Sequence, residues 1–497
     1  MGPASPTRGL YSVWAMLSGS IGRRLTRITG VVVAMAFGAP AAEEPRTAGA
    51  PVPAAVQPDA LFDVDGPLDL VETALVQHDV RMSLRITTSS DWAAQDVAEV
   101  PGRALCVTLA QGSPPLPKGR ICVARRDGRP ALSYTPLASN GEALATRLLA
   151  ARVSRPEPGV LQASFLPVAA GLSVGPYGWW SSSQWIDDTR CQTACVDRLP
   201  DTGLIPARLG LLGYPPCFGA AARDADRTCD NPDLGQSVTP PPERAQGILD
   251  SYCDALERPG LMTVCGFGAA RGEAAGTFAV IGDSHAASLK TALEVVSLGN
   301  SWRGISILRA ACPVTLAEKP ILPTRLRSRQ CVTWNRQVLA WLAANREVQT
   351  VFLSTHVTAE FGVPKGRDMF KTAQAGYRDA ISALLRSVRR VVVIRDVPSS
   401  SPNHLACVSR ALREGRSSGP ACAQRRSAAL RPDPLAAAAR ELRSSRVKLV
   451  DLTGHFCDRK RCYPVVGGAL AQRNETHLTP AFSATLGPYI LRALRRR

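Results

Sequence analysis

Val280-Ile281-Gly282-Asp283-Ser284-His285 is the stretch that decides the fold of the C-terminal half of this sequence. The apolar run 277–281 ends there, and the stretch 286–290 that follows is compatible with a helix. A short buried strand that enters a helix through a glycine turn lifts a serine hydroxyl to the carboxyl edge of a sheet, where helix amides can stabilise an oxyanion. The stretch therefore predicts Ser284 as a nucleophile, with Gly282 permitting the tight turn. An ordinary Asp or Ser helix cap would give the same letters.

A second stretch, Arg473-Asn474-Glu475-Thr476-His477-Leu478-Thr479-Pro480, supplies a candidate base. Serine is a poor nucleophile until a general base takes its proton, and His is the usual base near neutral pH. The chain has only six His, and His477 lies on a loop before a terminal amphipathic helix. A lone His in such a place is more often a surface or capping residue. Its pairing with the Gly-Asp-Ser turn makes His477 the candidate base for Ser284.

Together these motifs resemble the SGNH (GDSL-like) hydrolase and acyltransferase superfamily. The closer resemblance is to the extracytoplasmic SGNH domain often fused to membrane acyltransferases of the acyltransferase-three family. It covers roughly residues 265–497. The matching motifs are Gly282 to His285, Cys312-Pro313, Cys331-Val332-Thr333-Trp334, Arg395-Asp396-Val397-Pro398 and His477-Leu478-Thr479. The resemblance implies that Ser284 and His477 are catalytic, and that Gly282, Asp283 and His285 form the turn beside the oxyanion.

The third member of this site is left open by a departure from the family pattern. The family has Asp three residues before the His, whereas this chain has Asn474 there, followed by Glu475. Asn can orient an imidazole by hydrogen bonding but cannot offset the imidazolium charge as a carboxylate does. Glu475 could substitute if the loop turns it inward, and Asp283 could contribute. The middle Gly and Asn blocks of the family have no clear counterpart, and Thr355-His356 is read as a polar strand end.

The cysteines favour an exported chain with local disulfides. The 497 residues leave room for two or three domains, and the 14 cysteines are even in number. An even count in an exported protein indicates disulfides. Zinc is the alternative, but no pair has His companions at ligand spacing and Cys-x-x-Cys is absent, so neither a metal nor another cofactor is expected. The seven expected pairs are Cys106/Cys122, Cys191/Cys195, Cys217/Cys229, Cys253/Cys265, Cys312/Cys331, Cys407/Cys422 and Cys457/Cys462.

The N-terminus and the net charge bear on location and partners. Within residues 1–42, Arg23, Arg24 and Arg27 are followed by an apolar run and small residues, which is the order of an export signal. A membrane anchor is the alternative if the signal stays uncleaved. The net charge of +18 would suit contact with acidic envelope polymers or lipid headgroups, or reflect a solvated arginine-rich surface. Aromatic residues do not interleave with the basic ones, so a nucleic-acid partner is not expected.

The remaining chain divides into four expected parts. Residues 43–58 form an Ala/Pro-rich linker, and residues 59–200 show strand patterns, clearest in the alternation of 80–87, that predict a β-sandwich. Exposed Trp179, Trp180 and Trp185 would suit carbohydrate binding, although core positions are the other interpretation. Residues 201–268 are a Cys/Pro/Gly-rich connector. Residues 269–497 alternate strands and helices, which predicts an SGNH-type α/β domain with a doubly wound parallel sheet.

These observations predict an exported serine esterase or O-acyltransferase. Its substrates would be acyl groups, acetyl above all, on a cell-envelope glycan or other acylated polymer. A transferase would need a separate acyl donor, for which a membrane acyltransferase is a possible partner. The alternative is a non-catalytic envelope carbohydrate-binding protein on a degenerate SGNH scaffold.

Overall fold

The computed structural model describes most of the chain after residue 55. The described residues are 56–59, 68–98, 101–186, 191, 195–235, 237–246, 256–317, 320–363, 365–366 and 368–496. The predicted export signal and nearly all of the predicted linker lie outside them. Cys253 also lies outside them. No helix of the described ranges is long and apolar enough to cross a membrane.

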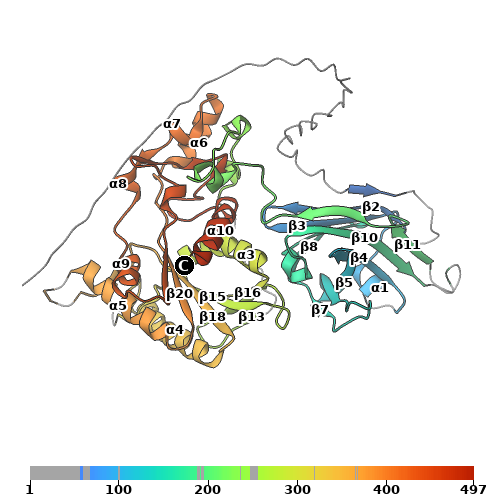
Figure 1. Ribbon diagram of the computed structural model, residues 1–497, viewed down its shortest axis with the longest axis horizontal. Coiled ribbons are helices and arrows are strands. Elements are labelled where there is room, and N and C mark those ends of the chain that lie inside the picture. The colour runs from blue at the N-terminus through green and yellow to red at the C-terminus, as the bar shows by residue number, and fades with distance from the viewer. Residues whose placement is uncertain are drawn as a thin grey trace, which may run out of the picture. The chain divides into compact units, whose positions relative to one another are not determined.

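Two antiparallel sheets form the N-terminal part (Figure 1). The first has the order β1-β2-β3-β9-β8, with bounds Val56–Pro58, Leu70–His78, Arg81–Thr88, Val160–Phe165 and Ala151–Glu157. The second has the order β11-β10-β4-β5-β6-β7, with bounds Cys195–Leu199, Gly175–Trp185, Ala104–Gln111, Leu116–Arg126, Arg129–Pro136 and Arg147–Leu148. A further strand, β12 (Ile205–Leu209), pairs with β10. The short elements α1 (Ala94–Ala98) and η1 (Pro167–Ala170) accompany these sheets.

Alternating burial explains why these residues form strands. In β3, Met82, Leu84 and Ile86 are buried while the residues between them are partly exposed, as expected when successive side chains point to opposite faces. Buried side chains of both sheets belong to one apolar core. A hydrogen bond of 2.9 Å between the hydroxyls of Thr73 (β2) and Ser181 (β10) also joins the two sheets.

The three tryptophans of β10 differ in their exposure to solvent. Trp179 is fully buried in the apolar core, so it cannot offer its ring to a sugar. Trp180 and Trp185 are partly exposed, and the guanidinium of Arg198 lies 5.2 Å from the ring of Trp180. Arg103 lies 3.6 Å from the ring of Trp185. An arginine therefore lies over each of the two accessible indoles.

A mixed sheet forms the centre of the C-terminal part. Its order is β13-β14-β16-β15-β18-β20-β22, with bounds Leu256–Glu257, Val264–Gly268, Trp302–Leu308, Gly276–Gly282, Val348–Ser354, Arg390–Ile394 and Val447–Val450. The last five in this order pair in parallel, whereas β13 and β14 add antiparallel strands at one edge. The prediction of a wholly parallel sheet is therefore wrong at this edge. Glycines 266 and 268 interrupt the apolar pattern of β14, which hid this strand in the sequence.

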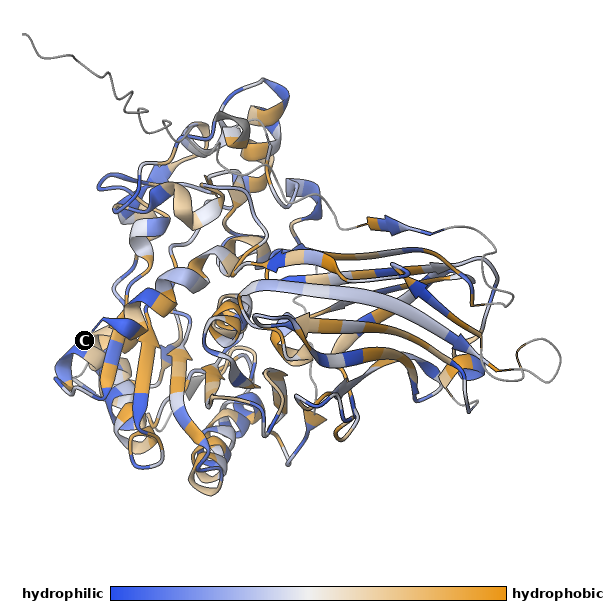
Figure 2. Cartoon of the chain, turned by 45° about the vertical axis from the view of Figure 1, so that its right-hand side comes forward, coloured by the Kyte–Doolittle hydropathy of each residue, from blue (hydrophilic) through white to orange (hydrophobic). Residues whose placement is uncertain are grey.

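Helices cover both faces of this sheet (Figure 1). Phe278 and Val280 of β15 pack with α3 (Lys290–Asn300) and α10 (Pro480–Arg495), whereas Ala279 and Ile281 belong to a second core with α4, α5 and α9. The alternation sends neighbouring side chains to opposite faces, and each face packs in an apolar core. The strands of this sheet are accordingly coloured as largely hydrophobic in Figure 2. The other helices are α2 (Ser284–Ser288), α4 (Arg325–Ala344), α5 (Met369–Leu384), α6 (His404–Arg413), α7 (Ser418–Ala421), α8 (Arg426–Ala429) and α9 (Pro434–Glu441).

A buried ion cluster links β3 to α3. Arg81 contacts Glu294 at 2.9 Å, and Lys290 contacts the same carboxylate at 2.7 Å. The side chain of Glu294 is only 2% exposed. Two cations are needed there because a buried carboxylate without partners costs several kcal/mol.

Six of the predicted disulfides are present among the described residues. They are Cys106–Cys122, Cys191–Cys195, Cys217–Cys229, Cys312–Cys331, Cys407–Cys422 and Cys457–Cys462. Cys265 is disulfide-bonded as well, and its predicted partner lies outside the described residues. The described cysteines include no free thiol.

Candidate active site

Ser284 lies at the end of β15, where the strand order of the sheet reverses. The neighbours of β15 are β16 and β18, so the chain leaves this central strand first to one side and later to the other. Open α/β sheets bind ligands at such switch points, beyond the carboxyl ends of the strands. Ser284 begins α2, and the first amides of a helix have no acceptor within it. The His285 amide donates to Asp283, so an oxyanion would face the other amides of this turn.

Gly282 makes the turn before Ser284 possible. A Cβ atom on Gly282 would clash with the backbone oxygen of Ser354 on β18 and with the Cβ of Ala286 in α2. The close approach of strand, turn and helix therefore requires a residue without a side chain.

Asp283 fixes the same turn by hydrogen bonds. Its Oδ1 accepts from the amide of His285 at 2.9 Å and so caps α2. Its Oδ2 accepts from the Thr355 hydroxyl at 2.6 Å and from the His356 amide at 2.9 Å. Oδ2 of Asp283 thus holds the turn after β15 to the loop after β18. The structure gives Asp283 this tethering position, not a contact with the candidate base.

His477 is brought to Ser284 across 193 positions of sequence. Its Nε2 lies 2.8 Å from the Ser284 hydroxyl, and its Nδ1 lies 3.1 Å from Oδ1 of Asn474. The Asn474 oxygen also accepts from the amides of Thr476 at 3.1 Å and of His477 at 2.9 Å. Because this oxygen can only accept, it holds the proton of a neutral ring on Nδ1 and leaves the Nε2 lone pair facing the serine. This is the tautomer that a general base requires.

Glu475 does not take part in this contact. It is exposed, and its backbone oxygen accepts from the amide of Ser400 at 2.7 Å. Gln472, on the same loop, accepts from the Ser400 hydroxyl at 2.7 Å and donates to the backbone oxygen of Pro398. These bonds anchor the loop that carries His477 to the segment after β20.

The protonation state of His477 suits a base. Burial, together with the neighbouring His285 and Arg473, lowers the pKa of His477 to about 4. The ring is therefore neutral above about pH 4, with a lone pair available at any ordinary pH.

His285 and Asp396 form a buried pair behind the serine. Nδ1 of His285 lies 2.6 Å from Oδ1 of Asp396, and their side chains are 3% and 2% exposed. The ring of His285 stacks on that of His356, with centroids 4.1 Å apart, and lies 5.0 Å from the ring of His477. The sequence motif predicts His285 in the turn but does not identify its partner. The position of Asp396 in the sequence could have indicated it. Asp396 follows β20 and Ser284 follows β15, and these two strands end at the same edge of the sheet.

This cluster does not favour a metal ion. His285, His356 and Asp396 each bring one ligand atom, and these atoms lie within 4.8 Å of one another. However, Oδ1 of Asp396 already accepts from His285 and from the Val397 amide, and Oδ2 accepts from the Val357 amide. A cation would have to displace these bonds, so we assign none.

Comparison with known proteins identifies the C-terminal half. Residues 252–492 match the family model described as SGNH domain (fused to AT3 domains). These residues form an SGNH domain. A search of curated proteins found no match. One similar solved structure is the lipopolysaccharide acetyltransferase periplasmic domain of Salmonella ser. Paratyphi A. The two chains are 18% identical over an alignment that covers 45% of this chain and 85% of the Salmonella domain, with a TM-score of 0.36.

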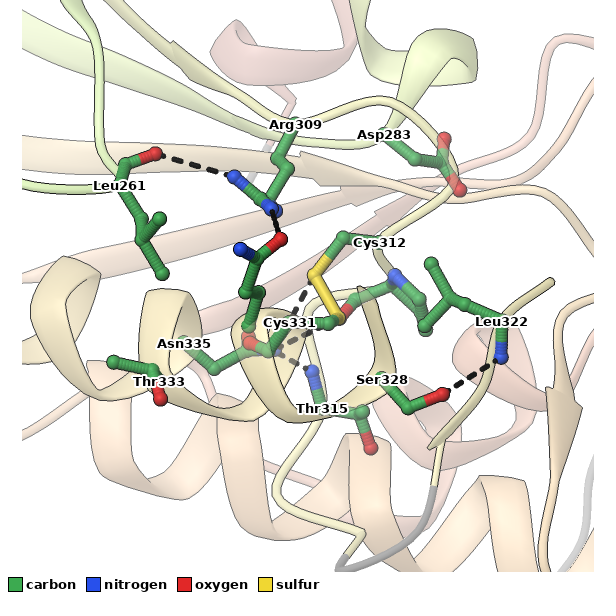
Figure 3. Close-up of a disulfide and its surroundings, with 12 residues drawn as sticks. Leu261, Asp283, Arg309, Cys312, Thr315, Leu322, Ser328, Cys331, Thr333 and Asn335 are labelled. Atoms are coloured by element: carbon green, nitrogen blue, oxygen red, sulfur yellow. Dashed lines mark hydrogen bonds between the residues drawn. A yellow bond between two sulfur atoms is a disulfide. The ribbon is translucent and has the colours of Figure 1, made fainter. Parts of the chain in front are cut away.

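A disulfide braces the loop of the SGNH domain that follows β16 (Figure 3). Cys312 is bonded to Cys331 of α4, and Asn335 accepts from the Thr315 amide at 3.2 Å. Its Nδ2 also donates to the backbone oxygen of Pro313 at 3.0 Å. In the same loop, the Arg309 amide donates to the backbone oxygen at position 282 at 3.0 Å. The two cysteine motifs of the sequence therefore stabilise a loop that contacts the serine turn.

Proposed function

We propose that the SGNH domain is a serine esterase or O-acyltransferase with Ser284 as nucleophile and His477 as base. The observation that carries this proposal is the 2.8 Å contact between the Ser284 hydroxyl and Nε2 of His477. It is supported by Asn474, whose oxygen lies 3.1 Å from Nδ1 and selects the basic tautomer. A site with this hydrogen-bond chain can activate a serine hydroxyl near neutral pH.

The reaction would proceed in two halves. Ser284 Oγ attacks the ester carbonyl as its proton moves to Nε2 of His477, and amides at the start of α2 stabilise the oxyanion. His477 then returns that proton to the alcohol that leaves, and an acyl-serine remains. In the second half, His477 takes a proton from water or from a sugar hydroxyl, which attacks the acyl-serine. Ser284 leaves and recovers the proton from His477.

The proposed substrate class rests on the disulfides and on the family match. We propose an exported protein that acts on acyl groups, acetyl above all, of a cell-envelope glycan. Six disulfides support an oxidising compartment, and SGNH domains of this kind are fused to acyltransferase-three membrane domains. A membrane acyltransferase could supply the acyl donor. The two N-terminal sheets are proposed to be a β-sandwich that holds the polymer.

Hydrolysis of 4-nitrophenyl acetate by the purified chain tests the proposal. We expect turnover that Ser284→Ala and His477→Gln abolish, while Glu475→Gln retains it. A transferase would release 4-nitrophenol faster when an oligosaccharide acceptor is added, and the acceptor would gain the mass of an acetyl group. Binding of the oligosaccharide without turnover in any variant would instead favour a non-catalytic carbohydrate-binding protein.

A further inference from the structure

The carboxylate of Asp396 is held rigidly beside His285. Oδ1 accepts from the amide of Val397 at 2.9 Å, and Oδ2 accepts from the amide of Val357 at 2.9 Å. The amide of Asp396 itself donates to Asp433 at 2.9 Å. With these bonds and a side chain only 2% exposed, the carboxylate cannot turn toward solvent. It faces one imidazole, that of His285, at 2.6 Å.

His285 lies between two other imidazoles. Its ring stacks on that of His356 at 4.1 Å and an interplanar angle of 19°. The centroid of the His285 ring also lies 5.0 Å from that of the His477 ring, and the two ring planes are tilted by 54°. Simultaneous protonation of three imidazoles this close is disfavoured, because like charges at such distances repel each other.

The surrounding charges decide which ring holds the proton. Burial lowers the pKa of His285, but Asp396 and then Asp283 outweigh it, so the pKa is raised above its ordinary value. The pKa of His356 is lowered by burial and by His285. The pKa of His477 is likewise lowered by burial and by His285, and also by the nearby Arg473. The carboxylates therefore favour the proton on His285.

We propose that Asp396 and His285 are positioning residues for the base. Asp396 keeps a proton on His285, and this buried cation beside His477 keeps the base neutral and able to accept the serine proton in acidic medium. The inference rests on the proposed function for its meaning, but not for its test. It also explains why residue 474 is Asn and not Asp. The side-chain amide of Asn474 fixes the tautomer of His477 without attracting a proton to that ring.

The test is an NMR titration of histidine rings labelled with ¹³C and ¹⁵N in the full chain. In the unaltered protein, His285 should remain protonated while His477 titrates near pH 4. In His285→Gln the pKa of His477 should rise by about 1 or more, because a neighbouring cation is lost. Asp396→Asn removes the carboxylate and with it the proton on His285, so the rise should be smaller. The double variant should match Asp396→Asn.

His455→Gln is the matched control, because His455 lies on another loop and contacts the Ala220 backbone oxygen at 3.2 Å. It should leave the titration of His477 unchanged. The inference is overturned if His285 is neutral while His477 titrates, a result that needs no variant to fold. It is also overturned if folded His285→Gln leaves the pKa of His477 unchanged or lower. Failure of the proposed function is separate, since it would show as ester hydrolysis that Ser284→Ala leaves intact.

Discussion

Asn474→Asp restores the residue that the SGNH pattern carries three positions before the His, and we expect it to speed ester hydrolysis. The substituted carboxylate would lie where Oδ1 of Asn474 now lies, 3.1 Å from Nδ1 of His477. The charge would stabilise the imidazolium that forms as the serine gives up its proton. Replacing the carboxylate by an amide in a Ser-His-Asp site costs about 10⁴ in kcat, partly because the ring then takes the wrong tautomer.

The structure indicates how much of that factor is missing here. The tautomer is already correct, because the Asn474 oxygen accepts from Nδ1 of His477. Only the charge is absent, so we expect a gain of about 10- to 100-fold in kcat, or about 1.4 to 2.7 kcal/mol of barrier. The same charge should raise the pKa of His477 from about 4, so the acid limb of the pH profile should move to higher pH.

Initial rates on 4-nitrophenyl acetate, measured on the alkaline side of both acid limbs, give the comparison. Glu475→Gln is the control, since Glu475 is exposed and its removal should change kcat less than about twofold. Thermal unfolding of each variant shows that the fold is retained. A folded Asn474→Asp variant with unchanged or lower kcat would refute the reasoning. A strong loss in Glu475→Gln would show that Glu475 supports His477 instead.

Three further predictions follow from the same contacts. Gly282→Ala should abolish hydrolysis and lower the melting temperature, because the methyl group would clash with the neighbouring strand, whereas Gly454→Ala, which has open space around it, should be neutral in both measurements. Arg81→Met should lower the free energy of unfolding in urea by about 3–5 kcal/mol, whereas Arg271→Met, in an exposed ion pair, should cost at most about 1 kcal/mol. The acid limb of kcat/KM should lie near pH 4, the pKa of His477, and a limb near 6.5 would contradict the described electrostatics.

Much of the C-terminal topology could be predicted because the central strands of the sheet are apolar runs followed by polar turns. The strand predicted from the apolar run 277–281 is β15, and the terminal amphipathic helix predicted after His477 is α10. Strand β14 could not be predicted in this way, since a strand with two glycines in five residues lacks an apolar period. Its pairing depends on the edge that β16 offers, which is a tertiary effect.

Some residues of the candidate site could be predicted from the sequence and others could not. Ser284 and His477 each lie in a distinctive local motif, so the residue types and their order predict the chemistry. The partner of His285 could not be predicted, because Asp396 contacts it across 111 positions and in a motif that equally suits a strand end. The choice between Asn474 and Glu475 depended on which side chain the loop turns inward, and no pattern of letters fixes that.

Covalent labelling tests the central claim most directly. A fluorophosphonate reacts with a serine only when a neighbouring base activates it, and the adduct can be located by peptide mass spectrometry. We expect one adduct per chain, on the peptide that contains Ser284, and none on Ser284→Ala or His477→Gln. Labelling that is absent from folded protein, or that persists in Ser284→Ala, would contradict it.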